Sequence, residues 1–187
     1  MITAAQLAAA LTGLRLLLRL DARGLELFEK TSGGFARSFV VAAILLPLHA
    51  LHWVLSFDAT KESLDFLPYL IVKAITYVLL WVLFPFIMLY VTDLLERRPR
   101  YYWHIVAYNW LQLPLGLLMM PIAFMADAHF LPQSVLGLLN LGALAAFFFY
   151  ATFLARWGLI LAPAMAFGIV VLDFVLGEVV NGLVGKI

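Results

Sequence analysis

"PYLIVKAITYVLLWVLFPFIMLYV", residues 68–91, is an apolar run that holds a single charged side chain, that of Lys73. An α-helix needs roughly 20 such residues to cross the hydrocarbon core of a bilayer. A membrane-spanning β-strand would alternate apolar and polar residues, and this stretch does not. The run therefore predicts a transmembrane helix, and it decides the fold class.

Comparable apolar runs occur at residues 39–57, 103–125, 135–155 and 159–184. Of the 187 residues, 65% are hydrophobic and 12% are charged, whereas a soluble domain is about half apolar and a quarter charged. We therefore expect an all-α protein, a polytopic bundle of five transmembrane helices within residues 35–187. An interfacial amphipathic segment, residues 1–34, precedes the bundle.

Proline and small residues indicate how these helices pack. Proline is tolerated inside a transmembrane helix where neighbouring groups bond the freed carbonyls, and it then kinks the helix. We therefore expect an irregular bundle with internal spaces, given prolines at Pro47, Pro85, Pro114, Pro121 and Pro163. Small residues four apart favour close helix packing. The last two helices carry them at Gly142, Ala146, Ala164 and Gly168.

The basic residues are distributed unequally between the two sides of the predicted bundle. One side carries Arg15, Arg19, Arg23, Lys30, Arg37, Arg97, Arg98, Arg100 and Arg156. The other side carries only Lys61 and Lys186 outside the spans. Because cytoplasmic loops are enriched in Lys and Arg, we expect a bacterial-type inner (plasma) membrane protein with its N-terminus in the cytoplasm and its C-terminus outside.

The arginines are also candidates for contact with lipid phosphates, namely Arg15, Arg19, Arg23, Arg97, Arg98, Arg100 and Arg156. Three arginines are directly followed by three aromatic residues in "RRPRYYW", residues 97–103. In a soluble protein that mixture could bind nucleic acid. Here both neighbouring segments are membrane spans, so the pattern indicates a headgroup region followed by an aromatic belt, with no nucleic-acid partner.

The first thirty residues have the pattern of an amphipathic helix. Leu7, Leu11, Leu14 and Leu18 share one face of a helical wheel, and Thr12, Arg15, Arg19 and Arg23 share a narrower polar face. Such a helix lies in the headgroup layer. It would either only orient the first span or sense lipid composition or curvature. Gly33 and Gly34 predict a turn before the first span.

Ionisable and amide side chains inside the spans are candidates for function. A rise of about 1.5 Å per residue places Lys73, Asp173, His52 and Asn140 at one level, about 7–9 Å inside the outer ends of their helices. We expect Lys73 and Asp173 to form an ion pair, with His52 and Asn140 nearby, around a pocket open to the outer side. In the alternative, Lys73 reaches the surface alone and Asp173 is bonded locally.

A second polar group, His104, Asn109 and Gln112, lies nearer the cytoplasmic end of the third span. Asn109 and Gln112 are three residues apart and share a helix face, so we expect them to form hydrogen bonds between helices. His49 and His52 could present two metal ligands on one face. No third ligand occurs in that segment, although Asp173 could supply one.

No catalytic signature is present in the chain. There is no cysteine, and the sequence contains no phosphate-binding loop, zinc-protease motif, dinucleotide fingerprint or nucleophile elbow. An intramembrane aspartyl protease needs two aspartates, and only Asp173 lies well inside a span. We therefore expect no catalytic residue, no cofactor and no metal.

The overall layout resembles the Yip family (Ypt-interacting proteins) and its bacterial relatives. The shared features are a cytoplasmic N-terminal segment, five closely spaced spans and an outside C-terminus. "GFARSF", residues 34–39, and "ARWGLILAPA", residues 155–164, are the stretches most similar to bacterial members. The chain lacks the Tyr-Gly-Pro motif of eukaryotic members, and no functional residue is carried over. The resemblance implies a non-enzymatic protein with other membrane proteins as partners.

These observations favour a protein that acts through contacts with membrane lipids, with other membrane proteins or with copies of itself. A scaffold, an accessory subunit and a membrane organiser all fit that description. The alternative is a small transporter or channel that uses the polar cluster around Lys73 and Asp173.

Overall fold

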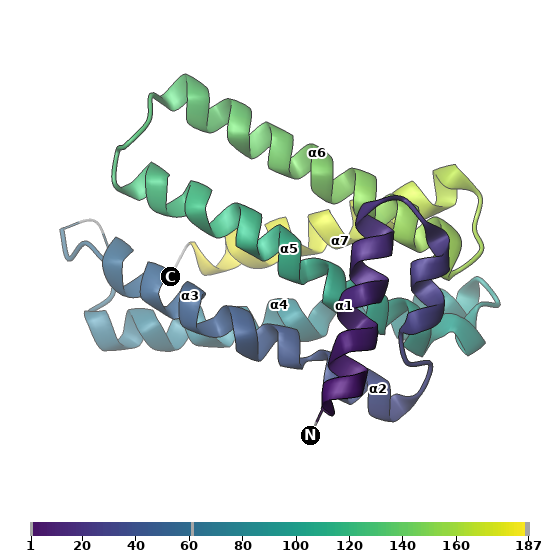
Figure 1. Ribbon diagram of the computed structural model, residues 1–187. Helices are drawn as coiled ribbons and strands as arrows, with labels where there is room; N and C mark the ends of the chain where they lie inside the picture. The colour runs from purple at the N-terminus through teal and green to yellow at the C-terminus, as the bar shows by residue number, and fades with distance from the viewer. Residues whose placement is uncertain (1, 61, 186–187) are drawn as a thin grey trace.

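The computed structural model describes residues 2–60 and 62–185, and these residues form an all-α fold (Figure 1). A helical hairpin comes first, made of α1 (Ala4–Leu18) and the 3-10 helix η1 (Ala22–Leu27), and the short helix α2 (Ser32–Ser38) follows. The five long helices are α3 (Val40–Ser56), α4 (Phe66–Leu94), α5 (Tyr101–Asp127), α6 (Gln133–Gly158) and α7 (Pro163–Val184). A 3-10 turn, η2 (Arg98–Arg100), joins α4 to α5.

Five helical segments are long and apolar enough to cross a membrane, which confirms the predicted fold class and span count. The first of them is α2 and α3 taken together, Ser32–Ser56, and the others are centred on α4, α5, α6 and α7. Half of the apolar window in the α5 segment is buried inside the protein, against 17–22% in the other four segments. Helix α5 is therefore the most buried of the five long helices.

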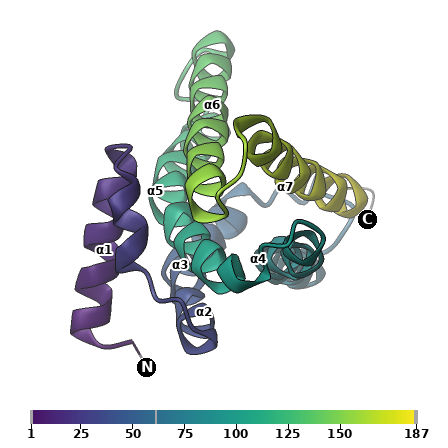
Figure 2. The same ribbon diagram turned by 90° about the vertical axis from the view of Figure 1, so that its right-hand side faces the viewer.

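The long helices form a closed ring. Helix α5 packs on α3 and α6, α6 packs on α7, α7 on α4, and α4 on α3. Figure 2 shows this arrangement from the end at which α4 joins α5. The prolines Pro47, Pro85, Pro114 and Pro121 all lie inside these helices. The largest apolar core lies where α3, α5 and α1 meet, around Leu45, Trp110 and Leu14.

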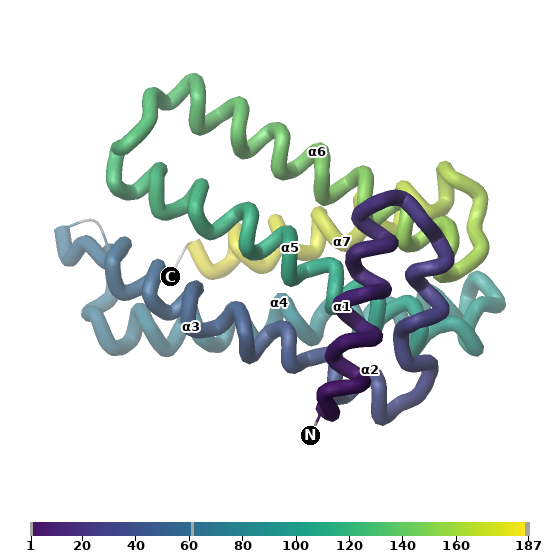
Figure 3. Tube along the Cα trace, viewed as in Figure 1, coloured from purple at the N-terminus to yellow at the C-terminus, as the bar shows by residue number. Residues whose placement is uncertain are grey.

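The N-terminal hairpin lies across one end of the long helices, and α1 does not run parallel to them (Figures 1 and 3). The Nε1 of Trp103 in α5 donates a 2.5 Å hydrogen bond to the carbonyl of Leu25 in η1. The hydroxyl of Tyr150 in α6 donates to the carbonyl of Leu18 at 3.1 Å. These bonds attach the hairpin to the same end of the bundle as the arginine-rich turn.

Helix α1 packs on the rest of the protein through only part of its leucine face. Leu14 is buried, but Leu7, Leu11 and Leu18 are 36–44% exposed. The contact instead follows the smallest residues, because a Cβ added to Gly24 would lie 2.5 Å from the carbonyl oxygen of Gly13. Two glycines therefore let the backbones of α1 and η1 touch, and the exposed leucines face outward, where lipid would lie.

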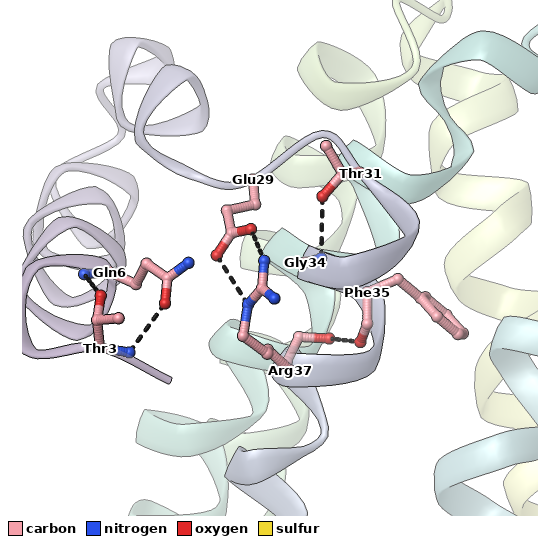
Figure 4. Close-up of polar contacts among 8 residues, drawn as sticks. Thr3, Gln6, Glu29, Thr31, Gly34, Phe35 and Arg37 are labelled. Atoms are coloured by element: carbon pink, nitrogen blue, oxygen red, sulfur yellow. Dashed lines mark hydrogen bonds and ion pairs between the residues drawn. The ribbon is translucent and has the colours of Figure 1, made fainter. Parts of the chain in front are cut away.

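The expected turn at Gly33 and Gly34 is wrong, because both residues lie inside α2. Thr31 caps this helix by accepting a 3.0 Å hydrogen bond from the Gly34 amide, as Figure 4 shows. Gly34 also leaves room for Glu29, whose carboxylate pairs with the Arg37 guanidinium. A side-chain cap and an ion pair thus continue the helix through the glycines.

The expected small-residue interface between the last two helices is also wrong. No atom beyond its own helix neighbours lies within 4 Å of a Cβ built on Gly142 or Gly168. Aromatic residues form this contact instead, since the Phe148 ring lies 5.6 Å from that of Phe167 and 5.5 Å from that of Phe174. The small residues are on outward faces, which the four-residue spacing alone does not reveal.

Candidate functional site

A cavity of about 400 Å³ lies inside the ring, and every long helix contributes to its wall. Examples from α3, α4, α5, α6 and α7 respectively are His49, Trp81, Gln112, Phe147 and Asp173. We call this space the central cavity. It agrees with the internal spaces expected from the prolines.

A second cavity, of about 650 Å³, adjoins the central cavity. The two share four lining residues, His49, Tyr77, Leu80 and Asn181. The second cavity extends to the α3–α4 connection and is lined there by Glu62 and Lys73. We call it the outer cavity, because it lies toward the end of the bundle opposite the arginines.

Asp173 and Tyr108 form the polar centre of the central cavity. The Tyr108 hydroxyl donates a 2.6 Å hydrogen bond to Oδ2 of Asp173. The Tyr108 ring packs on Phe84, with centroids 4.5 Å apart, which holds the hydroxyl in place. Asp173 lies about 15 Å along α7 from Pro163, in the middle of a helix that ends at Val184. It is therefore deeper than the outer level that the sequence predicted.

Lys73 lies apart from Asp173. Its ammonium is 5.1 Å from the centroid of the Tyr69 ring, one turn away on the same helix. Among the ion pairs of the described residues, none joins Lys73 to Asp173. The expected ion pair is therefore wrong. Asp173 accepts a hydrogen bond from Tyr108 of α5 in the middle of the bundle, whereas Lys73 lines only the outer cavity. The two residues are separate, as in the alternative, but Asp173 is bonded to another helix and not locally.

The other two members of the predicted outer cluster also lie elsewhere. Nε2 of His52 is 3.0 Å from Oδ2 of Asp127 at the end of α5, and the Ser56 hydroxyl donates to the same oxygen. Both groups contact one carboxylate oxygen, so this is a link between α3 and α5 and not a Ser–His–Asp relay. Asn140 is exposed on α6 and lines neither cavity, because its side of the helix faces away from the ring.

The second predicted group is divided among three environments. Asn109 is buried and donates a 2.8 Å hydrogen bond to the Ser38 hydroxyl of α2, which is the kind of interhelical bond expected of it. Gln112 lines the central cavity. His104 is buried against Gly158, where an added Cβ would lie 3.2 Å from its Nδ1, and neither ring nitrogen has a hydrogen-bond partner among the described residues.

The predicted lipid-contacting arginines gather at the end that carries the N-terminal hairpin. Arg15, Arg19 and Arg156 are exposed. Arg98 pairs with Asp93 at 2.9 Å, and Arg100 donates a 3.1 Å hydrogen bond to the Gly158 carbonyl. The latter bond joins the α4–α5 turn to the α6–α7 connection.

Two further arginines at this end, Arg23 and Arg97, have partners within the protein. Arg23 pairs with Asp21 at 2.6 Å and lowers the pKa of that carboxyl. Arg97 donates to the carbonyl of Glu96 at 3.2 Å. Contact of the arginines with lipid phosphates stays a prediction.

The two candidate metal ligands, His49 and His52, contact different neighbours. The His49 ring lies 4.9 Å from that of Tyr77, whereas His52 faces Asp127. Within residues 2–60 and 62–185, no three His, Asp or Glu side chains are placed to hold a metal ion together.

Comparison with known proteins adds no assignment, because no protein-family model, curated protein or solved structure matches this chain. The Yip-like layout therefore stays a prediction.

Two residues of these sites were missed in the sequence. Tyr108 precedes Gln112 by one helical turn, so the same reasoning that selected an amide inside the span could have selected the tyrosine. Asp127 lies just beyond the predicted run 103–125, whereas the structure makes it the last residue of α5.

Proposed function

We propose that this protein is a non-enzymatic integral membrane protein whose central cavity binds a small amphipathic molecule from the bilayer. The observation that carries the proposal is the cavity itself, with Asp173 in its wall. A helix that only anchored a protein would gain nothing from a carboxyl group near mid-bilayer, where ionisable residues are costly and are commonly functional.

The dimensions and lining of the cavities support binding of a small molecule. Their volumes of about 400 and 650 Å³ lie within the usual range for ligand sites, roughly 300–1,000 Å³. Such sites are mostly apolar with a few polar groups that orient the ligand. In the central cavity Tyr108, Gln112 and Asp173 are polar groups within a wall of apolar side chains such as Leu115 and Phe147.

We also propose that the protein lies in a bacterial-type inner membrane, with its N-terminus in the cytoplasm and its C-terminus outside. The basic residues of the N-terminal hairpin, of the α4–α5 turn and of the end of α6 lie at one end, as the Arg100–Gly158 bond indicates. Lys and Arg favour the cytoplasmic side. Relationship to the Yip family is likewise proposed on layout alone, and partner membrane proteins or self-association would then use the outer faces of the helices.

The test is whether a bound molecule leaves when the cavity is filled. Leu80 lines both cavities, so Leu80→Trp should block them. Leu79, its neighbour in sequence, is 43% exposed, so Leu79→Trp is a matched control. Native mass spectrometry of protein from mild detergent should detect a bound small molecule or lipid in the wild type and in Leu79→Trp, and lose it in Leu80→Trp. Equal retention in both variants would contradict the proposal.

A small transporter is the second candidate, and the adjoining outer cavity favours it. A solute that reaches Asp173 would have a polar route past Lys73 and Asn181. In that case, Asp173→Leu and Lys73→Leu should each abolish flux in proteoliposomes while the protein stays folded. An absence of flux with the parent protein would reject this candidate and leave the binding proposal standing.

A further inference from the structure

The central cavity has an imbalance of charge. The described residues that line it include two carboxylates, Asp173 and Glu178, but neither lysine nor arginine. The hydrogen bond from Tyr108 is a neutral one and supplies no positive charge. A carboxylate in apolar surroundings is stabilised mainly by a partner of opposite charge. Among the described residues of its wall, His49 is the one that could carry positive charge, and its ring packs against that of Tyr77.

Aromatic rings line the same cavity beside Asp173. Tyr77 and Trp81 come from α4, Phe147 from α6 and Phe174 from α7. The face of an aromatic ring attracts a cation, and this attraction grows when water is excluded. The same rings repel an anion. The carboxylates and the aromatic rings therefore both favour a positively charged ligand.

The nearby lysine does not neutralise this cavity. Lys73 is placed over Tyr69 in the outer cavity, and it takes part in no ion pair with Asp173. Within the central cavity, no described lysine or arginine therefore pairs with the Asp173 carboxylate.

We propose that the central cavity binds a lipophilic organic cation, with the positive centre beside the Asp173 carboxylate and its apolar substituents against the aromatic wall. Amines and onium ions with several hydrocarbon groups belong to this class. This inference rests on the proposed function, since it names the class of ligand for the same cavity.

Tetraphenylphosphonium and tetraphenylborate provide a test of the sign of charge, because they have the same shape and opposite charge. Binding of each is measured by equilibrium dialysis against purified protein in neutral detergent, with Leu80→Trp as the blank for partition into the micelle. We expect saturable binding of the phosphonium at least about tenfold tighter than that of the borate, which corresponds to roughly 1.4 kcal/mol. Equal binding, preference for the borate, or no phosphonium binding overturns the inference.

Two variants separate a ligand contact from a structural role. Asp173→Asn should weaken phosphonium binding at least about tenfold, whereas Asp65→Asn, at an exposed carboxyl, should not. Tyr108→Phe should tighten binding, because the carboxylate loses a competing donor. If Asp173 only stabilised the helix packing through its bond to Tyr108, both Asp173→Asn and Tyr108→Phe would weaken binding.

Failure of this inference is distinguishable from failure of the proposed function. If Leu80→Trp releases a co-purified neutral or anionic molecule but the phosphonium does not bind, the cavity is a ligand site of another class. If Leu80→Trp releases nothing and neither probe binds, both proposals fail.

Discussion

The hydroxyl of Tyr108 in α5 lies 2.6 Å from Oδ2 of Asp173 in α7. Each of these helices packs along α6, and the hydrogen bond crosses the space between them. It therefore ties the last helix to α5.

Loss of this bond should destabilise the protein modestly. Hydrogen bonds between transmembrane helices contribute roughly 0.6–2 kcal/mol, so Tyr108→Phe should lower the free energy of unfolding by about 1 kcal/mol. Unfolding in mixed micelles by SDS measures this change. In a double-mutant cycle, Tyr108→Phe and Asp173→Asn should couple by a similar amount. Strict additivity of the two substitutions would mean that the bond contributes nothing.

The link between His52 and Asp127 should hold the outer ends of α3 and α5 together. Asp127→Asn removes a charge that both His52 and Ser56 contact. We expect a loss of about 1 kcal/mol in unfolding free energy and faster amide exchange at the end of α5. Asp65→Asn removes an exposed carboxyl directly before α4 and serves as the control. Equal behaviour of the two variants would argue against a link.

The glycine contact between α1 and η1 should be intolerant of a methyl group. A Cβ on Gly24 would lie 2.5 Å from the Gly13 carbonyl oxygen, which is backbone and cannot move aside alone. Gly24→Ala should therefore raise amide exchange throughout α1 and leave the long helices unchanged. Gly142→Ala meets no neighbour within 4 Å, so this control should be neutral or slightly stabilising, because Ala favours helix over Gly. Unchanged exchange in Gly24→Ala would contradict the close approach.

The arginine-rich turn should control how the chain threads the membrane. Replacing Arg97, Arg98 and Arg100 together with glutamate should invert or scramble the orientation, since these residues supply much of the positive charge on one side. Reporter fusions after each helix measure this, and the triple replacement with lysine is the matched control. An unchanged orientation in the glutamate variant would remove the main support for a cytoplasmic N-terminus.

Trp103 should anchor the N-terminal hairpin to α5. Its Nε1 bonds the Leu25 carbonyl, and the charged groups of Lys30 and Arg100 lie 4.1 and 5.0 Å from the centre of its ring. Trp103→Phe keeps an aromatic ring but loses the donor, so about 1 kcal/mol should be lost and limited proteolysis should cut near η1. Trp157→Phe, at an exposed ring, is the control. Equal protease resistance would show that the hairpin is held by other contacts.

The sequence by itself determined the number of spans, their approximate limits and the gathering of the arginines at one end. These follow from the length of each apolar run and from charge outside the runs, which are local properties of the chain. It also indicated internal space, through prolines such as Pro85 and Pro114 that interrupt the helices.

Only the tertiary structure decided the rotation of each helix about its own axis, and so which side chains face the bundle. It placed Tyr108 beside Asp173, Asn140 on the outside and Lys73 in a separate cavity. In water, a helix shows by its polar face which side is buried. In lipid the outer face is as apolar as the packed one, so the sequence carries little signal for rotation. The depth of a polar residue can be counted along the chain, but its partner depends on that rotation.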